Sequence, residues 1–161
     1  MKNKYHILWI DDEWKKMDSF IDLCSFQYNI ELEPFTTQKA GLDAFAQNPT
    51  FYEGIILDAK LLDEDENEVA DIASLYKAVT KLQTEFKDVP FFISTGQPDL
   101  LDARHFESYC RSTYNHRYYE KGDDDEELCS DIIKTIEGKN QRKIMNKYPC
   151  LLYTSPSPRD S

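Results

Sequence analysis

The sequence lacks any apolar run long enough to cross a bilayer, and its start, MKNKYHILWIDD, contains no signal-peptide cleavage region. Basic residues are also few: 19 lysines and arginines stand against 30 aspartates and glutamates, which leaves a net charge of −11. Such a charge argues against direct binding of nucleic acids or anionic membranes by this region. We therefore expect a cytoplasmic protein whose partner is cationic or whose surface binds a cation.

Cysteine and histidine are scarce, with four and three residues respectively. The cysteines show no CxxC or Cys/His metal spacing, and the histidines are scattered along the chain, so neither residue type indicates a metal site. Because small thiols are common in buried helices, we expect the cysteines to be reduced core residues. They are Cys24, Cys110, Cys129 and Cys150.

The C-terminal residues differ in character from the rest of the chain. In CLLYTSPSPRD (150–160) the apolar periodicity is lost, and this string resembles the frame-shifted translation of a sequencing adapter. We expect one folded domain over 1–138, a helix extension or the start of a linker over 139–149, and a non-native tail over 150–161. A genuine disordered Ser/Pro tail is the alternative. On the adapter interpretation, any effector domain beyond Pro149 is missing.

Short apolar runs alternate with amphipathic stretches from Tyr5 to about Glu137. Parallel neighbours need crossover helices, so five such units predict an α/β fold with a doubly wound, five-stranded parallel sheet. The aspartates before the last helix, and Thr37 before the second, are expected to cap helix N-termini. Predicted strands cover 5–10, 30–35, 54–57, 90–94 and 117–119, and predicted helices cover about 14–27, 38–47, 68–86, 100–114 and 124–137.

Charged or hydroxyl residues follow four of the predicted strands, at the point where each strand ends. They are Asp11 with Asp12, then Asp58, Thr95 and Lys121. Ligands of a doubly wound sheet bind outside the carboxyl ends of its strands, so these side chains are expected to share one pocket.

Three carboxylates in one small pocket would repel one another unless a cation bound them. Oxygen-only ligands of this kind suit Mg²⁺. We expect Asp12 and Asp58 to bind the ion directly, Asp11 to act through a water molecule, and the backbone carbonyl of Lys60 to supply a further oxygen. An aspartate can also attack phosphorus and form an aspartyl phosphate, which makes Asp58 the candidate nucleophile.

With these residues in this order, the chain resembles a response-regulator receiver domain of two-component signalling over roughly residues 5 to 137. The resemblance implies a (βα)5 fold with strand order 2-1-3-4-5, an acidic pair at Asp11 and Asp12, and phosphorylation of Asp58 by a histidine kinase or phosphotransfer protein. It makes Lys121 the phosphate-binding lysine and Thr95 the switch hydroxyl.

The resemblance also implies a switch surface. Tyr118 falls three residues before the lysine, at the position of the family's switch aromatic. Phosphorylation would draw Thr95 toward the phosphate and turn Tyr118 inward, and so reshape the surface formed by the fourth helix, the fifth strand and the fifth helix. Such a protein is a signalling switch and not a metabolic enzyme.

Two features depart from the family pattern. Gly122 follows the lysine where the family usually has proline, often in a cis peptide, and we expect this to loosen the loop before the fifth helix. The segment LLDEDENEVAD after Asp58 is long and acidic and lacks the usual glycine. We interpret the acidic runs at 63–68 and 123–127 as solvated loop and helix-start charges, without a catalytic role.

Two other functions remain open from the sequence. A degenerate receiver would serve as a phosphorylation-independent protein-binding module. An aspartyl-phosphate phosphohydrolase is less favoured, because the motif of that family has a second aspartate two residues after the nucleophile, where this chain has Lys60. Neither alternative changes the predicted fold or pocket.

Overall fold

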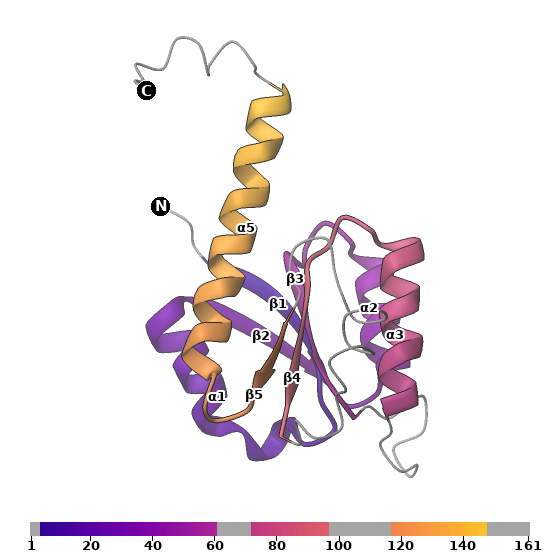
Figure 1. Cartoon of the computed structure of the whole chain (residues 1–161), viewed down its shortest axis with the longest axis vertical. Coiled ribbons are helices and arrows are strands. Elements are labelled where there is room, and N and C mark those ends of the chain that lie inside the picture. Colours follow the sequence, from indigo (N-terminus) through magenta and orange to yellow (C-terminus); the bar gives the residue numbers. More distant parts are fainter. Residues whose placement is uncertain (1–3, 61–71, 97–116, 148–161) are drawn as a thin grey trace.

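The computed structural model describes residues 4–60, 72–96 and 117–147, in which helices cover both faces of a five-stranded sheet (Figure 1). The predicted helix over 100–114 lies outside the described residues, as do Cys110, Cys150 and the C-terminal tail. The elements in chain order are β1 (Tyr5–Ile10), a 3-10 turn (Trp14–Lys16), α1 (Asp18–Asp22), a π-helical turn (Leu23–Gln27), β2 (Ile30–Phe35), α2 (Gln38–Gln47), β3 (Gly54–Asp58), α3 (Ile72–Glu85), β4 (Phe91–Thr95), β5 (Tyr118–Glu120) and α5 (Asp125–Lys147).

All neighbouring strands pair in parallel, in the order β2-β1-β3-β4-β5. This confirms the predicted doubly wound α/β sheet and its strand order. The register aligns Ile10 of β1 with Leu57 of β3, and Leu57 with Ile93 of β4. Because these strands end level with one another, the residues that follow them gather at one edge of the sheet.

The strands supply two apolar cores because their side chains alternate between the two faces. Leu8, Ile10 and their neighbours pack under α2 and α3, whereas Ile7 and Trp9 pack under α1 and α5. The same alternation continues along β3 and β4, and Figure 1 shows the helices on opposite sides of the sheet. Both faces are covered, as near-continuous apolar strands predict.

The second helix is held closely against the sheet at its start. Its N-cap Thr37 accepts a hydrogen bond from the Ala40 N–H at 3.2 Å, as predicted. A Cβ at Gly41 would lie 2.6 Å from the side chain of Ile10, so only glycine allows α2 to approach β1 this closely. The end of β1, which leads into the acidic pair, is therefore tightly fixed.

The predicted helix over 14–27 is broken into three short segments. The backbone of Met17, at φ −112° and ψ 44°, lies outside the helical region and separates the 3-10 turn from α1. The segment then ends in the π-helical turn, which contributes the buried Cys24. Cys24 and Cys129 are both free and buried, as expected of reduced core thiols, and their Sγ atoms lie 3.4 Å apart.

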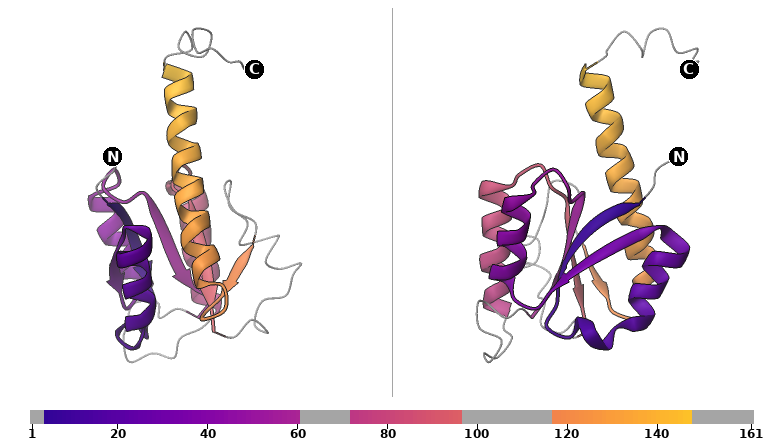
Figure 2. Two further views of the ribbon diagram at one scale, coloured as in Figure 1. Left: turned by 90° about the vertical axis from the view of Figure 1, so that its left-hand side faces the viewer. Right: turned by 180° about the vertical axis from the view of Figure 1, so that it is seen from behind.

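The fifth helix is longer than predicted, because it continues as a helix through 139–147. Its C-terminal part projects beyond the sheet at the edge where the strands begin (Figure 2). No helix within the described ranges combines the length and apolar character that crossing a membrane requires. The fifth strand lies one residue later than predicted, which places Lys121 directly after it.

Candidate functional site

The predicted site residues meet at the carboxyl edge of the sheet. Asp58 is the last residue of β3, Thr95 is the last residue of β4, and Lys121 directly follows β5. Asp12 lines the same hollow from the loop after β1. We call this hollow the carboxyl-edge pocket; its volume is about 300 Å³, and it is lined by Asp12, Glu13, Asp58, Lys60, Thr95, Gly96 and Lys121.

Lys121 joins two of the carboxylates. Its Nζ lies 2.6 Å from Asp11 Oδ2 and 3.4 Å from Asp58 Oδ2. The other oxygen of Asp11 accepts a hydrogen bond from the Glu13 N–H at 2.9 Å. Asp11 is fully buried, so this carboxylate is fixed from both sides, whereas Asp58 keeps a small exposed surface toward the pocket.

The carboxylates also form a cluster that could hold a divalent metal ion. Asp11, Asp12 and Asp58 each place one oxygen within 4.8 Å of the other two. With Lys121 protonated and all three carboxylates ionised, the set carries a charge of −2, which one divalent cation would neutralise. Hard oxygen donors suit Mg²⁺, which usually keeps several water ligands of its own. Lys60 also lines the pocket, and the role of its carbonyl stays a prediction.

Burial disfavours the charged form of the candidate nucleophile. It raises the pKa of Asp58 from 3.8 to about 7, with a further contribution from the charge of Asp11 and an opposing one from Lys121. Burial followed by the charge of Asp11 also raises the pKa of Asp12. Burial alone would lower the pKa of Lys121, but Asp58 and Asp11 outweigh it and raise that pKa. One ammonium therefore does not compensate the carboxylates fully.

Thr95 and Tyr118 share one face of the sheet. Tyr118 pairs with Ile93, two residues before Thr95, so both side chains point toward the core under α2 and α3. Tyr118 is half-buried against that core, whereas Tyr119 is fully buried on the opposite face. The hydroxyl of Tyr119 donates to Asp131 at 2.7 Å. The two predicted switch residues are thus neighbours across β4 and β5.

Two aspartates at the start of α5 play a part that the sequence interpretation missed. They were expected to cap the helix, but the carboxylate of Asp124 accepts the Glu120 N–H at 2.9 Å and that of Asp125 accepts the Gly122 N–H at 3.1 Å. Both bonds lead back to the loop around Lys121. A useful signal was present: acidic side chains in the first turn of a helix can reach back to earlier backbone N–H groups, and these two lie three or four residues after the bonded positions.

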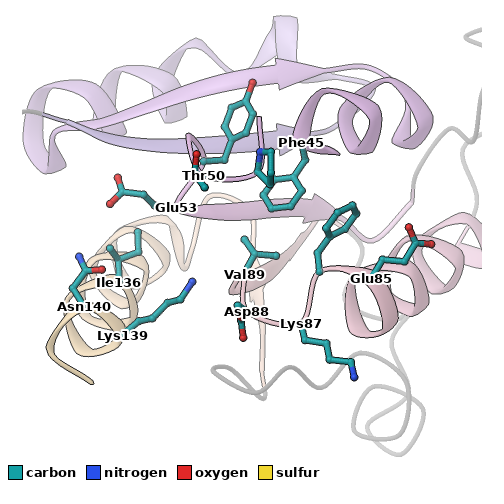
Figure 3. A pocket seen from close by; sticks show the side chains of 13 residues that line it. Phe45, Thr50, Glu53, Glu85, Lys87, Asp88, Val89, Ile136, Lys139 and Asn140 are labelled. Atoms are coloured by element: carbon teal, nitrogen blue, oxygen red, sulfur yellow. The ribbon is translucent and has the colours of Figure 1, made fainter. Parts of the chain in front are cut away.

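A larger hollow lies at the opposite edge of the sheet, where the strands begin (Figure 3). We call it the amino-edge cavity; its volume is about 530 Å³, and none of the predicted site residues lines it. Phe45 and Phe86 both line it and contact each other edge to face, with ring centroids 4.9 Å apart. Charged residues such as Glu85 and Lys87 lie exposed at its rim.

Several solved structures that are similar to this chain are response-regulator receiver domains. A receiver domain protein from Clostridium thermocellum matches with a TM-score of 0.61 and 22% identity, over 85% of this chain and 98% of its own. The receiver domain of an HD domain-containing protein from Pseudomonas fluorescens matches with a TM-score of 0.64 and 17% identity, over 89% of this chain and 94% of its own. A receiver domain protein from Methanospirillum hungatei matches with a TM-score of 0.59 and 20% identity, over 86% of this chain and 98% of its own.

The likeness establishes the fold: this chain has the receiver-domain fold. No protein-family model and no curated protein sequence matches it. What the carboxyl-edge pocket does must therefore be argued from its own side chains.

Proposed function

We propose that the protein is a phosphoacceptor receiver of a two-component system, in which Asp58 accepts a phosphoryl group from a phosphohistidine. The observation that carries this proposal is the position of Lys121, in contact with both Asp11 and Asp58 in a pocket that Asp12 and Thr95 also line. A nucleophile, a phosphate-binding cation, a hydroxyl donor and an acidic cluster thus lie together. The receiver-domain fold supports the same assignment.

In the proposed reaction an oxygen of Asp58 attacks the phosphorus atom and the P–N bond to the donor histidine breaks. The electron pair of that bond stays on the imidazole, which leaves as a neutral ring because its other nitrogen carries a proton. Lys121 would move from its carboxylate partners to the incoming phosphoryl oxygens, and the Thr95 hydroxyl would donate to another of them. Bound Mg²⁺, held by Asp11, Asp12 and Asp58, would neutralise charge on the transferring group.

The raised pKa of Asp58 gives the cation a second role in this proposal. A carboxyl group with a pKa of about 7 is only partly ionised at neutral pH, and the protonated form is a poor nucleophile. Positive charge close to Asp58 favours the carboxylate. Occupation of the acidic cluster by a divalent cation would therefore both bind phosphate and prepare Asp58 for attack.

The response to phosphorylation would pass through β4 and β5. A phosphoryl group on Asp58 would draw the Thr95 hydroxyl toward it, and Tyr118 would turn toward the space that Thr95 leaves. The two side chains share one face, so this movement needs no change in strand register. A histidine kinase or phosphotransfer protein would be the donor partner, and an effector would recognise the altered surface.

The decisive experiment incubates the purified protein with Mg²⁺ and acetyl phosphate and measures its intact mass. We expect the addition of one phosphoryl group. The mass should stay unchanged when EDTA removes Mg²⁺ before the reaction, and in Asp58→Asn. Asp43→Asn is the matched control, because it removes an exposed carboxylate on α2 that pairs with Lys39.

Two results would overturn the proposal. An unchanged mass, beside a competent receiver treated identically, would instead favour a phosphorylation-independent binding module. Sustained hydrolysis of small phosphate esters would favour a phosphohydrolase, because a receiver transfers phosphate only to and from its own aspartate.

A further inference from the structure

The phosphate-binding lysine is held firmly on its strand side. The Lys121 N–H donates to the Thr95 carbonyl at 2.8 Å, which extends the pairing of β4 and β5 by one residue. From this point the side chain, only 17% exposed, reaches back to Asp11 and Asp58. The position of the ammonium therefore depends on where the backbone places Lys121.

The backbone on both sides of Lys121 is held by side chains from the start of α5. The Glu120 N–H is bound by the Asp124 carboxylate, and the Gly122 N–H by the Asp125 carboxylate. The Asp124 N–H also donates to the Glu120 carbonyl at 2.9 Å, which closes the turn. Three consecutive N–H groups, with Lys121 at the centre, thus each have an acceptor.

Gly122 lets the backbone turn within this arrangement. Its φ of +89° is a conformation that glycine adopts readily, whereas proline and other residues adopt it with strain or not at all. The described residues contain no cis peptide bond, so no locked proline turn sets the path of this loop. In the structure the two carboxylates tie this loop to the helix.

The start of α5 is itself tied to the start of β5. Arg117 lies 2.7 Å from the Glu127 carboxylate and 3.5 Å from Asp124, and its guanidinium stacks over the Tyr119 ring at 4.3 Å. The helix that supplies the two acceptors is therefore braced against the strand that leads to Lys121. Strand, loop and helix form one closed set of contacts.

We propose that Asp124 and Asp125 are positioning residues for Lys121: by binding the N–H groups on either side of it, they hold its ammonium between Asp11 and Asp58. This inference deepens the proposed function, because an ammonium held beside Asp58 is close to the phosphoryl group that Asp58 would accept. A misplacement of about 1 Å in a reacting group can cost roughly a hundredfold in rate. We expect partial loss of placement to slow phosphorylation about tenfold.

Three variants separate positioning from charge and from helix capping. Asp125→Ala removes the acceptor for the Gly122 N–H. Asp125→Asn removes the same charge but keeps an acceptor oxygen. Asp123→Ala removes one charge from an exposed position in the same turn, where no backbone bond is lost. Circular dichroism before and after heating verifies that each variant is folded.

The first readout does not depend on phosphorylation. Limited acetylation with acetic anhydride, followed by peptide mass spectrometry, gives the reactivity of Lys121 relative to the exposed Lys134 of α5. In Asp125→Ala we expect this ratio to rise about threefold or more, because the ammonium leaves its carboxylate partners and becomes accessible. Asp125→Asn and Asp123→Ala should stay near the wild-type ratio.

The second readout is the rate of phosphorylation by acetyl phosphate in Mg²⁺, which should fall in Asp125→Ala and recover in Asp125→Asn. The positioning role would be overturned if folded Asp125→Ala had the wild-type acetylation ratio and the wild-type phosphorylation rate. It would also be overturned if Asp123→Ala slowed phosphorylation as much as Asp125→Ala does. If the wild type accepts no phosphate but the labelling ratio still rises in Asp125→Ala, the proposed function fails while the positioning role stands.

Discussion

The two hollows at opposite edges of the sheet differ in size and in charge. The amino-edge cavity, at about 530 Å³, is the larger, and aromatic side chains form part of its wall, whereas Glu85, Lys87 and Asp88 are exposed at its rim. The carboxyl-edge pocket is only about 300 Å³, yet it contains a nearly buried carboxylate whose pKa is raised to about 7. Burying charge is costly, so a fold keeps it mainly where it has a use.

The comparison shows that volume alone is a poor guide to function in this molecule. The amino-edge cavity is lined by residues of α2, α3 and α5 and of the loops that lead into β3 and β4, and its aromatic residues pack on the core. The carboxyl-edge pocket is lined by polar residues that end or directly follow four strands, β1, β3, β4 and β5. The first region should matter for stability and the second for chemistry, and four predictions test that division.

The largest expected effect is on stability, at the amino-edge cavity. Phe45 is only 3% exposed, and its ring packs edge to face on Phe86 and stacks on Tyr52. Phe45→Ala should lower the free energy of unfolding by about 3–5 kcal/mol, measured by urea denaturation. The folded fraction should still accept phosphate at the wild-type rate. If the fully folded variant accepted phosphate more slowly than the wild type, the amino-edge cavity would also affect the chemistry of the carboxyl-edge pocket.

The second prediction concerns the pH dependence of stability without metal. Because the pKa of Asp58 rises from 3.8 unfolded to about 7 folded, between these pH values the folded protein retains a proton that the unfolded chain has lost. Stability should therefore fall as pH rises from about 4 to about 7, by at most ~4 kcal/mol for this group.

Asp58→Asn supplies the control for this pH dependence, because asparagine does not titrate. The fall in unfolding free energy should be smaller in the variant than in the wild type when both are measured without metal. Mg²⁺ should oppose the wild-type fall, because it binds the ionised carboxylates of the folded state. Identical pH profiles for the two proteins would show that Asp58 ionises normally in the folded state.

The third prediction tests the acidic cluster. Asp12→Asn should weaken Mg²⁺ binding at least about tenfold, or ~1.4 kcal/mol, when titrated by calorimetry at neutral pH. Glu13→Gln is the matched control, because this neighbouring residue also lines the pocket but lies outside the group of three carboxylates. If both variants lose affinity equally, general negative charge and not a defined ligand set attracts the ion.

The smallest expected effects are at the charged rim of the amino-edge cavity. Glu85→Gln and Lys87→Ala change exposed side chains, so each should alter the free energy of unfolding by less than about 0.5 kcal/mol. Phosphorylation by acetyl phosphate should keep its wild-type rate in both. A clear loss of rate in either variant would show that the two edges are coupled.

Much of the fold could be predicted from local sequence patterns. The strand alternation that sends Leu8 to one face and Trp9 to the other is visible in the sequence, and so are the polar residues that end β3 and β4. The cap at Thr37 was also predicted, because it needs only a hydroxyl directly before the helix. Each of these features depends on residues close together in the chain.

Other features could not be predicted because they depend on competition between distant groups. The helix expected over 14–27 breaks at Met17, where Trp14 turns its indole N–H toward the Thr36 hydroxyl and both Trp14 and Met17 pack against the core. Apolar spacing alone did not reveal this break. In the same way, the acidic run at 123–127 looked like solvated helix-start charge.

The sequence by itself determined the order of strands and helices and the chemical groups at the strand ends, because periodicity and turn position are local properties. Only the tertiary structure decided how those groups pair. Lys121 bonds Asp11 across 110 residues, and Asp125 bonds the loop beside that lysine instead of its own helix. Partner choice follows from which donors and acceptors share a small buried space, and the folded sheet creates that space.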